Sequence, residues 1–204
     1  MRRRSILRKS LPAVGLILFP GCIDNGTVKN NGKNSSGNRD FPELAIVSVD
    51  ETSDGSSIAV ENISEFEEDS PAQIEITFTN SMDEPKLYTF GSVMVFSGYV
   101  GEHVDGHAEL WLEPENGRGY TPLGDSSSVP TEPDSGCWQY PIEEYGVHDF
   151  EEGVTLEPGE SISNQFDIFH RAPTDRCLPS GRYRFADSDS NHSETWGFVV
   201  ELSY

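Results

Sequence analysis

The sequence predicts an all-β protein whose main part is an antiparallel sandwich of about seven to nine short strands. Short apolar runs alternate with polar residues at a period of two, as in strands that have one wet face. Turn signals rich in Gly, Pro, Asn and Asp separate these runs, and no segment after residue 22 has a sustained helical stripe. Many short strands without helices favour two packed antiparallel sheets.

The charge of the chain excludes two classes of partner. The 204 residues contain 35 Asp and Glu but only 14 Lys and Arg, so the net charge is −21. Five of the bases lie in the first nine residues; after them nine bases face 35 acids, and 9 − 35 gives −26. Nucleic-acid binding and a basic membrane-binding patch both need clustered Lys and Arg, so neither is expected.

Residues 1–21 are predicted to be an export signal. A cationic start (Met1–Ser10) precedes a short apolar run (Leu11–Phe19), which covers about 14 Å and cannot cross a hydrocarbon core of about 30 Å. A charged segment, a short apolar segment and a small residue form an export signal. Arg3 and Arg4, followed by a spacer, two apolar residues and a base, resemble the twin-arginine signal. The alternative is a generic secretory signal.

Cys22 is predicted to carry a lipid. The run that ends in Gly21-Cys22 resembles a lipobox, in which the cysteine is lipidated and becomes the first residue, although Phe19 and Pro20 depart from the usual pattern. The alternative is ordinary cleavage, with Cys22 discarded or free. Two lipid chains anchor a protein far better than one. We therefore expect the mature protein on the extracellular face of the cell membrane, with the membrane as a partner through the anchor.

Residues 22–40 are predicted to be a tether, and residues 41–204 the β-sandwich domain. The tether is rich in Asn, Gly and Ser and nearly free of apolar residues. Possible glycan sites begin at Asn25, Asn34, Asn62 and Asn191. The acidic bias resembles that of exported proteins of halophilic archaea, in which concentrated salt screens the self-repulsion. The alternative is an acidic but otherwise ordinary surface protein.

The strands are expected in the following order. The predicted ranges are 44–49, 57–61, 74–79, 87–96 as a central strand, 108–112, 153–156, 162–168, 181–185 and 196–202. The alternation of Ile74, Ile76 and Phe78 with polar residues is the clearest strand pattern. Residues 64–70 are expected to form at most one helical turn, and residues 113–135, rich in Pro, Gly and Ser, a long loop.

Three short motifs resemble the immunoglobulin-like sandwiches of prokaryotic surface proteins. They are a strand that ends in Asn (Ile74–Asn80), an L-x-P-G-E turn (Leu156–Glu160) and a G-x-Y-x-F strand (Gly181–Phe185). The resemblance implies an immunoglobulin-like β-sandwich with an adhesive or accessory role, and it implies no substrate. Cys137 is followed directly by Trp138, so the antibody-type Cys…Trp…Cys spacing is absent.

A disulfide between Cys137 and Cys177 is expected. The chain has three cysteines, and lipidation of Cys22 leaves these two as a pair in an oxidising compartment.

No metal or cofactor is expected. A blue-copper site needs a His soon after its Cys and usually a Met, and neither follows Cys177 at the required spacing. His103 and His107, with His148-Asp149 as further candidates, read as a solvated loop rather than a metal site. Asp187–Asn191 begins like a calcium loop but lacks its later Gly and Glu, which leaves an exposed turn or weak cation binding.

The sequence shows no catalytic apparatus. It lacks a G-x-S-x-G elbow, and carboxylate pairs such as Glu143-Glu144 and Glu151-Glu152 are expected by chance among so many acids. Trp138, Tyr140 and Tyr145 lie close in sequence and are interpreted as a packing cluster, with a ligand surface as the alternative. The expected function is a non-enzymatic binding or structural module of the cell envelope. The alternative is an accessory ligand-binding lipoprotein that serves a transporter, so the partner is an envelope protein or a small ligand.

Overall fold

A computed structural model describes residues 41–53, 55–106, 108–123, 128–140, 142–171, 177–187 and 196–204. The predicted signal with Arg3 and Arg4, the predicted lipid site at Cys22 and the tether lie outside these residues. The described residues form 13 strands and no helix. The strands are β1 (Glu43–Val49), β2 (Ser56–Ser64), β3 (Ala72–Asn80), β4 (Lys86–Phe90), β5 (Val100–His103), β6 (Glu109–Pro114), β7 (Tyr120–Leu123), β8 (Gln139–Tyr140), β9 (Glu144–Val147), β10 (Glu152–Leu156), β11 (Ser161–Arg171), β12 (Gly181–Ala186) and β13 (Gly197–Ser203).

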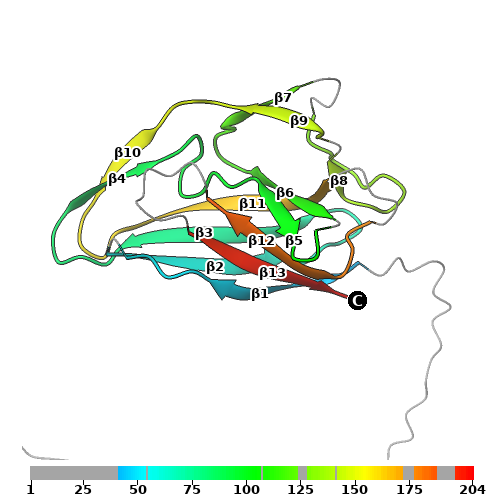
Figure 1. Ribbon diagram of the computed structural model, residues 1–204, viewed down its shortest axis with the longest axis horizontal. Coiled ribbons are helices and arrows are strands. Elements are labelled where there is room, and N and C mark those ends of the chain that lie inside the picture. Colours follow the sequence, from blue (N-terminus) through cyan, green and yellow to red (C-terminus); the bar gives the residue numbers. More distant parts are fainter. Residues whose placement is uncertain are drawn as a thin grey trace, which may run out of the picture. The chain divides into compact units, whose positions relative to one another are not determined.

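One large sheet forms the body of the domain. Its strand order is β1-β13-β12-β5-β6-β11-β3-β2, and β8 adds a short parallel pairing to β11. The two edge strands, β1 and β2, lie next to each other, so the sheet curls into a sandwich that is nearly closed like a barrel (Figure 1). The all-β, antiparallel prediction is confirmed, with 13 strands where about seven to nine were predicted.

The inner face of this sheet holds the main core. In β3 the apolar side chains are buried and the polar ones half-buried, as the period of two predicts. The strand register places the matching positions of the neighbouring strands on the same face. This inner set comprises Ile74, Ile76, Phe78, Leu110, Leu112, Phe166, Ile168, Tyr183, Phe185, Phe198 and Val200, all at most 1% exposed.

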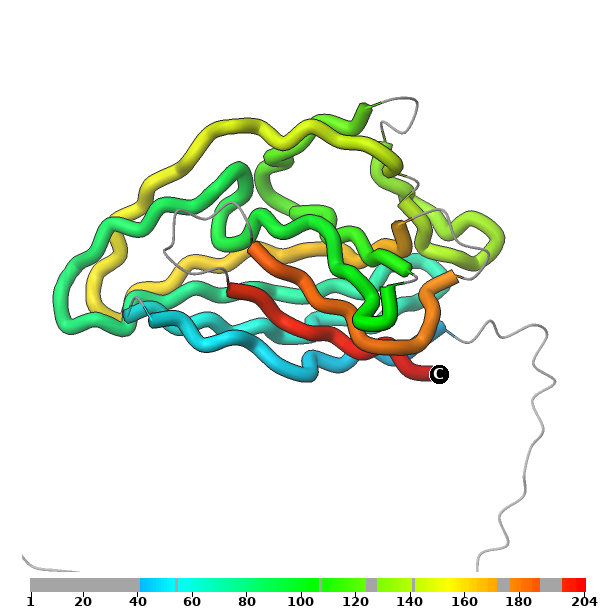
Figure 2. Tube along the Cα trace, viewed as in Figure 1, coloured from blue at the N-terminus to red at the C-terminus, as the bar shows by residue number. Residues whose placement is uncertain are grey.

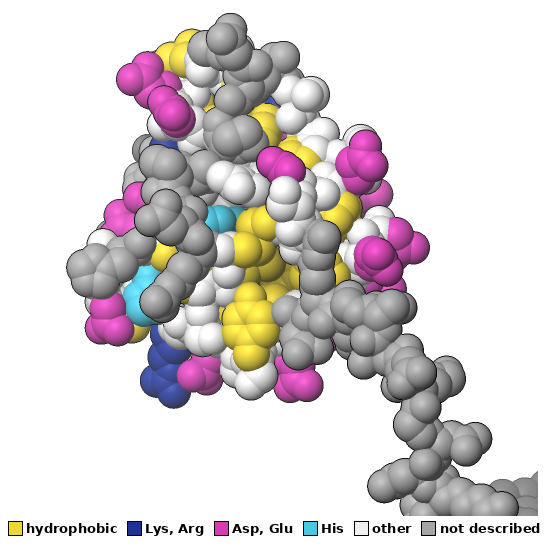
Figure 3. Space-filling model, turned by 90° about the vertical axis from the view of Figure 1, so that its right-hand side faces the viewer, with side chains coloured by type: hydrophobic (Ala, Val, Ile, Leu, Met, Phe, Trp, Pro, Cys, Tyr) yellow, Lys and Arg dark blue, Asp and Glu magenta, His cyan; other side chains and the backbone are white. Residues whose placement is uncertain are grey.

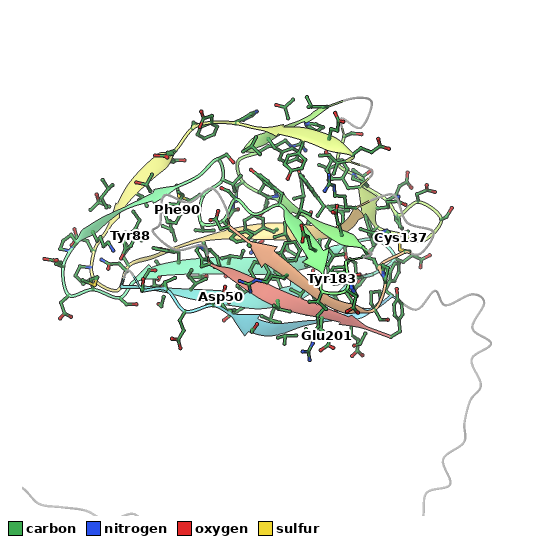
Figure 4. All side chains as sticks on the ribbon, viewed as in Figure 1. Asp50, Tyr88, Phe90, Cys137, Tyr183 and Glu201 are labelled. Atoms are coloured by element: carbon green, nitrogen blue, oxygen red, sulfur yellow. A yellow bond between two sulfur atoms is a disulfide. The ribbon has the colours of Figure 1, made fainter. Side chains whose placement is uncertain are left out.

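Two separate two-stranded ribbons, β4–β10 and β7–β9, cover parts of the large sheet (Figure 2). The β4–β10 ribbon packs on β3 through Tyr88 and Phe90, which are labelled in Figure 4. The Phe78 ring lies edge-on to both, and its centroid is 4.7 Å from that of Tyr88 and 5.0 Å from that of Phe90. Buried Asn80 fixes this ribbon, because its Oδ1 accepts a hydrogen bond from the Tyr88 hydroxyl and its Nδ2 donates one to the Leu156 carbonyl.

The β7–β9 ribbon covers a second, aromatic core on the outer face of the sheet. Trp111 of β6 points away from the inner core and stacks on Tyr99, at a centroid distance of 5.4 Å. Tyr120 of β7 and Tyr145 of β9 both lie edge-on to Trp111 at 4.9 Å, and Tyr140 completes the cluster at 6.0 Å. Aromatic pairs of this kind contribute about 0.5–1.5 kcal/mol each beyond their burial. Contacts between aromatic rings therefore hold the β7–β9 ribbon on the large sheet.

The predicted central strand over residues 87–96 is wrong in its second half. Strand β4 ends at Phe90 and pairs only with β10, so it is part of a cover and not of the large sheet. Residues 91–96 are irregular, and all of them are buried except Met94, which is half-buried. Val95 adopts a φ of 67°, which no extended strand allows, and the Ser97 hydroxyl bonds to both the N–H and the carbonyl of Val93. Hydrophobicity predicted the burial but not the turn.

The expected loop over residues 113–135 also differs from the structure. The predicted loop over residues 113–135 contains β7, which pairs with β9. Residues 64–70 form no helical turn: Ser64 ends β2, and the following residues are irregular. The short strands β5, β8 and β9 were not predicted. In β5 the pattern is hidden by Gly101, whose inner position faces the Phe185 ring, so that a Cβ there would lie 2.4 Å from it.

The predicted disulfide is present. Cys137 and Cys177 are joined across a sequence separation of 40 residues, with their Cα atoms 5.6 Å apart. The bond links the segment that leads into β8 to the segment that leads into β12. Among the described residues, none belongs to a helix long and apolar enough to cross a membrane.

One of the four possible glycan sites, at Asn62 on β2, lies in the described part of the chain. The Asn62 Nδ2 atom donates a hydrogen bond of 3.0 Å to the Leu44 carbonyl. A glycan would be attached to this same nitrogen and would compete with that bond.

Candidate functional site

A groove of about 700 Å³ lies between the outer face of the large sheet and strand β9, which Figure 1 shows above β5 and β12. The segment before β5, strand β5 itself, β9 and β12 all contribute to its walls. The lining residues are Ser97, Gly98, Tyr99, Val100, Glu102, His103, Val104, Tyr145, Val147, Arg184 and Ala186.

The turn at Val95 sets one wall of the groove. After that turn the chain runs through Ser97 and Gly98 against β12. A Cβ on Gly98 would lie 2.3 Å from the Ala186 carbonyl oxygen, so only glycine fits between the two backbones. The close approach places the following residue, Tyr99, beneath the ribbon, where its hydroxyl shares a 2.9 Å hydrogen bond with Ser92.

The rings of Tyr99 and Tyr145 form the aromatic side of the groove. Their centroids lie 6.1 Å apart with the planes almost perpendicular. Tyr99 is nearly buried, whereas Tyr145 is half-buried and presents part of its ring to the groove. The guanidinium of Arg171 lies over the Tyr145 ring, 5.7 Å from its centroid. Tyr145 therefore joins the outer aromatic core to the groove.

A buried carboxylate holds the aromatic layer, and with it the groove wall, in place. Glu113 has a side chain only 7% exposed, and its Oε1 accepts hydrogen bonds from Arg118 Nε and Nη2 at 3.1 and 2.8 Å. Its Oε2 accepts from Trp111 Nε1 at 3.1 Å and from the Tyr120 hydroxyl. Burial, followed by the hydrogen bond to Glu113, raises the pKa of Tyr120 far above its usual range, so this phenol stays a donor.

Arg184, in the floor of the groove, is already paired. Its Nη1 lies 3.2 Å from Asp50 Oδ1, and its Nη2 binds Asp50 Oδ2. Asp50, labelled in Figure 4, follows β1, and its N–H donates a hydrogen bond to the Gly197 carbonyl. The hydrogen bond to Asp50 raises the pKa of Arg184, which remains a cation. The Arg184–Asp50 ion pair therefore leaves little net charge at the Arg184 end of the groove floor.

The candidate metal ligands that the structure describes do not form a cluster. Among the described residues, no three His, Cys, Asp or Glu side chains form a group that could hold a metal ion. His103 Nδ1 accepts a hydrogen bond from the Asp105 N–H at 3.1 Å, and His148 Nε2 lies 2.8 Å from the Thr121 hydroxyl on the β7–β9 ribbon. His107 lies outside the described residues.

The calcium-like segment and the three aromatic residues named from the sequence also lie in different places in the structure. In the calcium-like segment Asp187 is buried, and its N–H is bonded to the Trp196 carbonyl, while residues 188–191 lie outside the described part. Trp138 and Tyr140 are buried in the aromatic core, which confirms the packing interpretation for them. Tyr145 alone of the three lines the groove. Sequence reasoning missed Gly98, Glu102 and Arg184, because nothing in the sequence shows that β5, β9 and β12 meet.

Hydrophobic side chains also gather in the middle of one end face of the domain, with Asp and Glu side chains around them (Figure 3). The C-terminus lies at this end (Figure 1), and Tyr204 there is 66% exposed, with its hydroxyl bonded to the Leu178 carbonyl at 3.1 Å.

Comparison of the chain with protein-family models, with curated proteins and with solved structures finds no match in any of the three.

Proposed function

We propose that this chain is a non-catalytic binding module, lipid-anchored on the extracellular face of the cell membrane, that holds a small ligand in the groove beside β9. The groove is the observation that supports a ligand binder over a purely structural module. Ligand sites are typically concave, mostly apolar and fitted with a few convergent polar groups. Here Tyr145 and three valines supply the apolar walls, and Glu102 and Arg184 the polar groups.

We propose no catalysis, because two polar side chains among the described residues of the groove, Arg184 and His103, are already engaged by other groups. A general base must lie within hydrogen-bond reach of the proton that it abstracts. Arg184 is engaged by Asp50, and His103 Nδ1 accepts from the backbone. We therefore propose that the domain binds a partner. The partner is a small ligand if the protein has an accessory role beside a transporter. It is an envelope protein if docking occurs on the hydrophobic end face.

The anchor is tested at the mature N-terminus. We expect mass spectrometry of the protein extracted from its native membrane to find Cys22 as the first residue, with the mass of two lipid-borne chains added. A free N-terminus downstream of Cys22 would contradict the anchor but would leave the groove proposal untouched. Substitution of Arg3 and Arg4 by lysine tests the export route, because it removes both arginines but keeps the charge of the signal.

Ligand binding is tested by filling the groove. Val147 on β9 is 43% exposed and lines the groove, so Val147→Trp is expected to occupy it without disturbing the core. Ligand-observed NMR with choline, glucose and acetate should show binding of at least one compound to the unaltered domain and loss of that signal, about tenfold or more, in Val147→Trp.

Val47→Trp is the control for this experiment. Val47 on β1 is 40% exposed, almost the same as Val147, but does not line the groove. The control should keep the signal. Equal loss in both variants, or no binding of any of the three compounds, would contradict the proposed function.

A further inference from the structure

Four charged side chains occupy matching positions across the outer face of the sheet. The register places Arg184 of β12 opposite Glu102 of β5, Glu102 opposite Glu109 of β6, and Glu109 opposite Arg171 of β11. Side chains directly opposite each other on adjacent strands lie about 4.5–5.5 Å apart at Cβ. The four therefore form one row across the floor below β9, with cations at its ends and carboxylates in its middle.

Both arginines of this row form ion pairs with carboxylates other than Glu102. Arg184 binds Asp50, and Arg171 Nη1 lies 2.6 Å from Glu109 Oε2. Arg171 is fixed further, because its Nε and Nη2 donate to the carbonyls of Ile142 and Glu143 at 2.9 and 2.8 Å. Among the ion pairs of the described residues, none includes Glu102. The row thus leaves one exposed carboxylate that forms no ion pair with the described residues, and this carboxylate lines the groove.

Apolar and aromatic groups surround that carboxylate. Val100, two residues before Glu102 and on the same face of β5, lines the groove together with Val104 and Val147. Tyr145 adds part of a phenol ring. A cation that carries methyl groups is attracted to aromatic rings and buries its methyl groups against apolar side chains, while a carboxylate balances its charge.

We infer that the groove binds a small organic cation, of the alkylammonium or quaternary ammonium class. The inference rests on the proposed function and names its ligand. A neutral ligand such as a sugar would leave Glu102 without a counter-charge, and an anion would meet it directly.

Choline and its neutral carbon isostere, 3,3-dimethylbutan-1-ol, test the inference. The two have nearly the same shape and differ in charge. Titration calorimetry of the β domain, with salt held constant, should give a Kd for choline at least about tenfold lower than for the isostere. Glu102→Gln should raise the Kd for choline about tenfold and leave the isostere unchanged, since a tenfold change corresponds to 1.4 kcal/mol.

Glu61→Gln is the matched control. Glu61 is exposed on β2 and does not line the groove, so the substitution removes the same global charge without touching the site. Its Kd for choline should stay within about twofold of the unaltered value. Both variants alter exposed side chains, and equal melting temperatures would confirm that they fold.

Three outcomes would overturn the inference while leaving the proposed function standing. These are equal affinity for choline and its isostere, equal effects of Glu102→Gln and Glu61→Gln, and binding of glucose or acetate in place of choline with sensitivity to Val147→Trp. The absence of binding by every compound tested would overturn the proposed function itself.

Discussion

Transfer of the β domain from about 3 M to about 0.01 M salt is expected to unfold it cooperatively. After the first nine residues nine bases face 35 acids, so at least 26 carboxylates in that part of the sequence have no base of their own. The Debye length is about 3 Å at 1 M salt and about 30 Å at 0.01 M, comparable with the width of the domain. Repulsion that concentrated salt screens then acts across the whole molecule and destabilises the compact state.

The ion pairs of the fold do little to offset this repulsion. The structure shows Arg118–Glu113, Arg171–Glu109, Arg182–Glu201 and Arg184–Asp50. Arg182 and Glu201 are both exposed and 3.6 Å apart, and a pair of that kind contributes at most about 1 kcal/mol. Far-ultraviolet circular dichroism during stepwise dialysis measures the effect. Return of the spectrum on adding salt back is the control, and a constant spectrum and melting temperature would contradict the salt-adapted interpretation.

Removal of the disulfide is expected to cost about 4 kcal/mol of unfolding free energy. The bond closes a loop with a sequence separation of 40 residues, and the chain-entropy estimate for such a loop gives this value. The double variant Cys137→Ser with Cys177→Ser avoids an odd thiol. Its urea midpoint should fall by about 2 M, for an m value of about 2 kcal/mol/M.

Reduction of the unaltered domain is the matched control, and it should lower the midpoint by a similar amount. A change below about 1 kcal/mol, or two reactive thiols in the denatured, unreduced protein, would contradict the role of the bond.

The strand pattern could be predicted where one face of a strand is wet and the other buried. Ile74, Ile76 and Phe78 alternate with polar residues, and β3 has this pattern throughout. The pattern fails in β6, where Leu110 to Pro114 are all buried because the inner core covers one face and the aromatic layer the other. It also fails after Phe90, where the positive φ of Val95 follows from tertiary packing and not from any local preference.

The groove could not be predicted, since it depends on which strands become neighbours. Glu102 and Arg184 are 82 positions apart in the chain and become opposite residues only through the pairing of β5 with β12. The sequence offered Trp138, Tyr140 and Tyr145 together as a possible ligand surface. That Tyr145 lines the groove while Trp138 and Tyr140 are buried depends on where the β7–β9 ribbon lies. The disulfide, in contrast, could be predicted from the number of cysteines and from the oxidising compartment that the export signal implies.

The most direct test of ligand binding by the groove is an amide chemical-shift map of the isotope-labelled domain during titration with whichever compound binds. We expect the largest shifts within residues 97–104, 145–147 and 184–186, the three segments that contain the groove-lining residues. Shifts concentrated instead on β2 and β3, on the hydrophobic end face, or nowhere in the domain would contradict it.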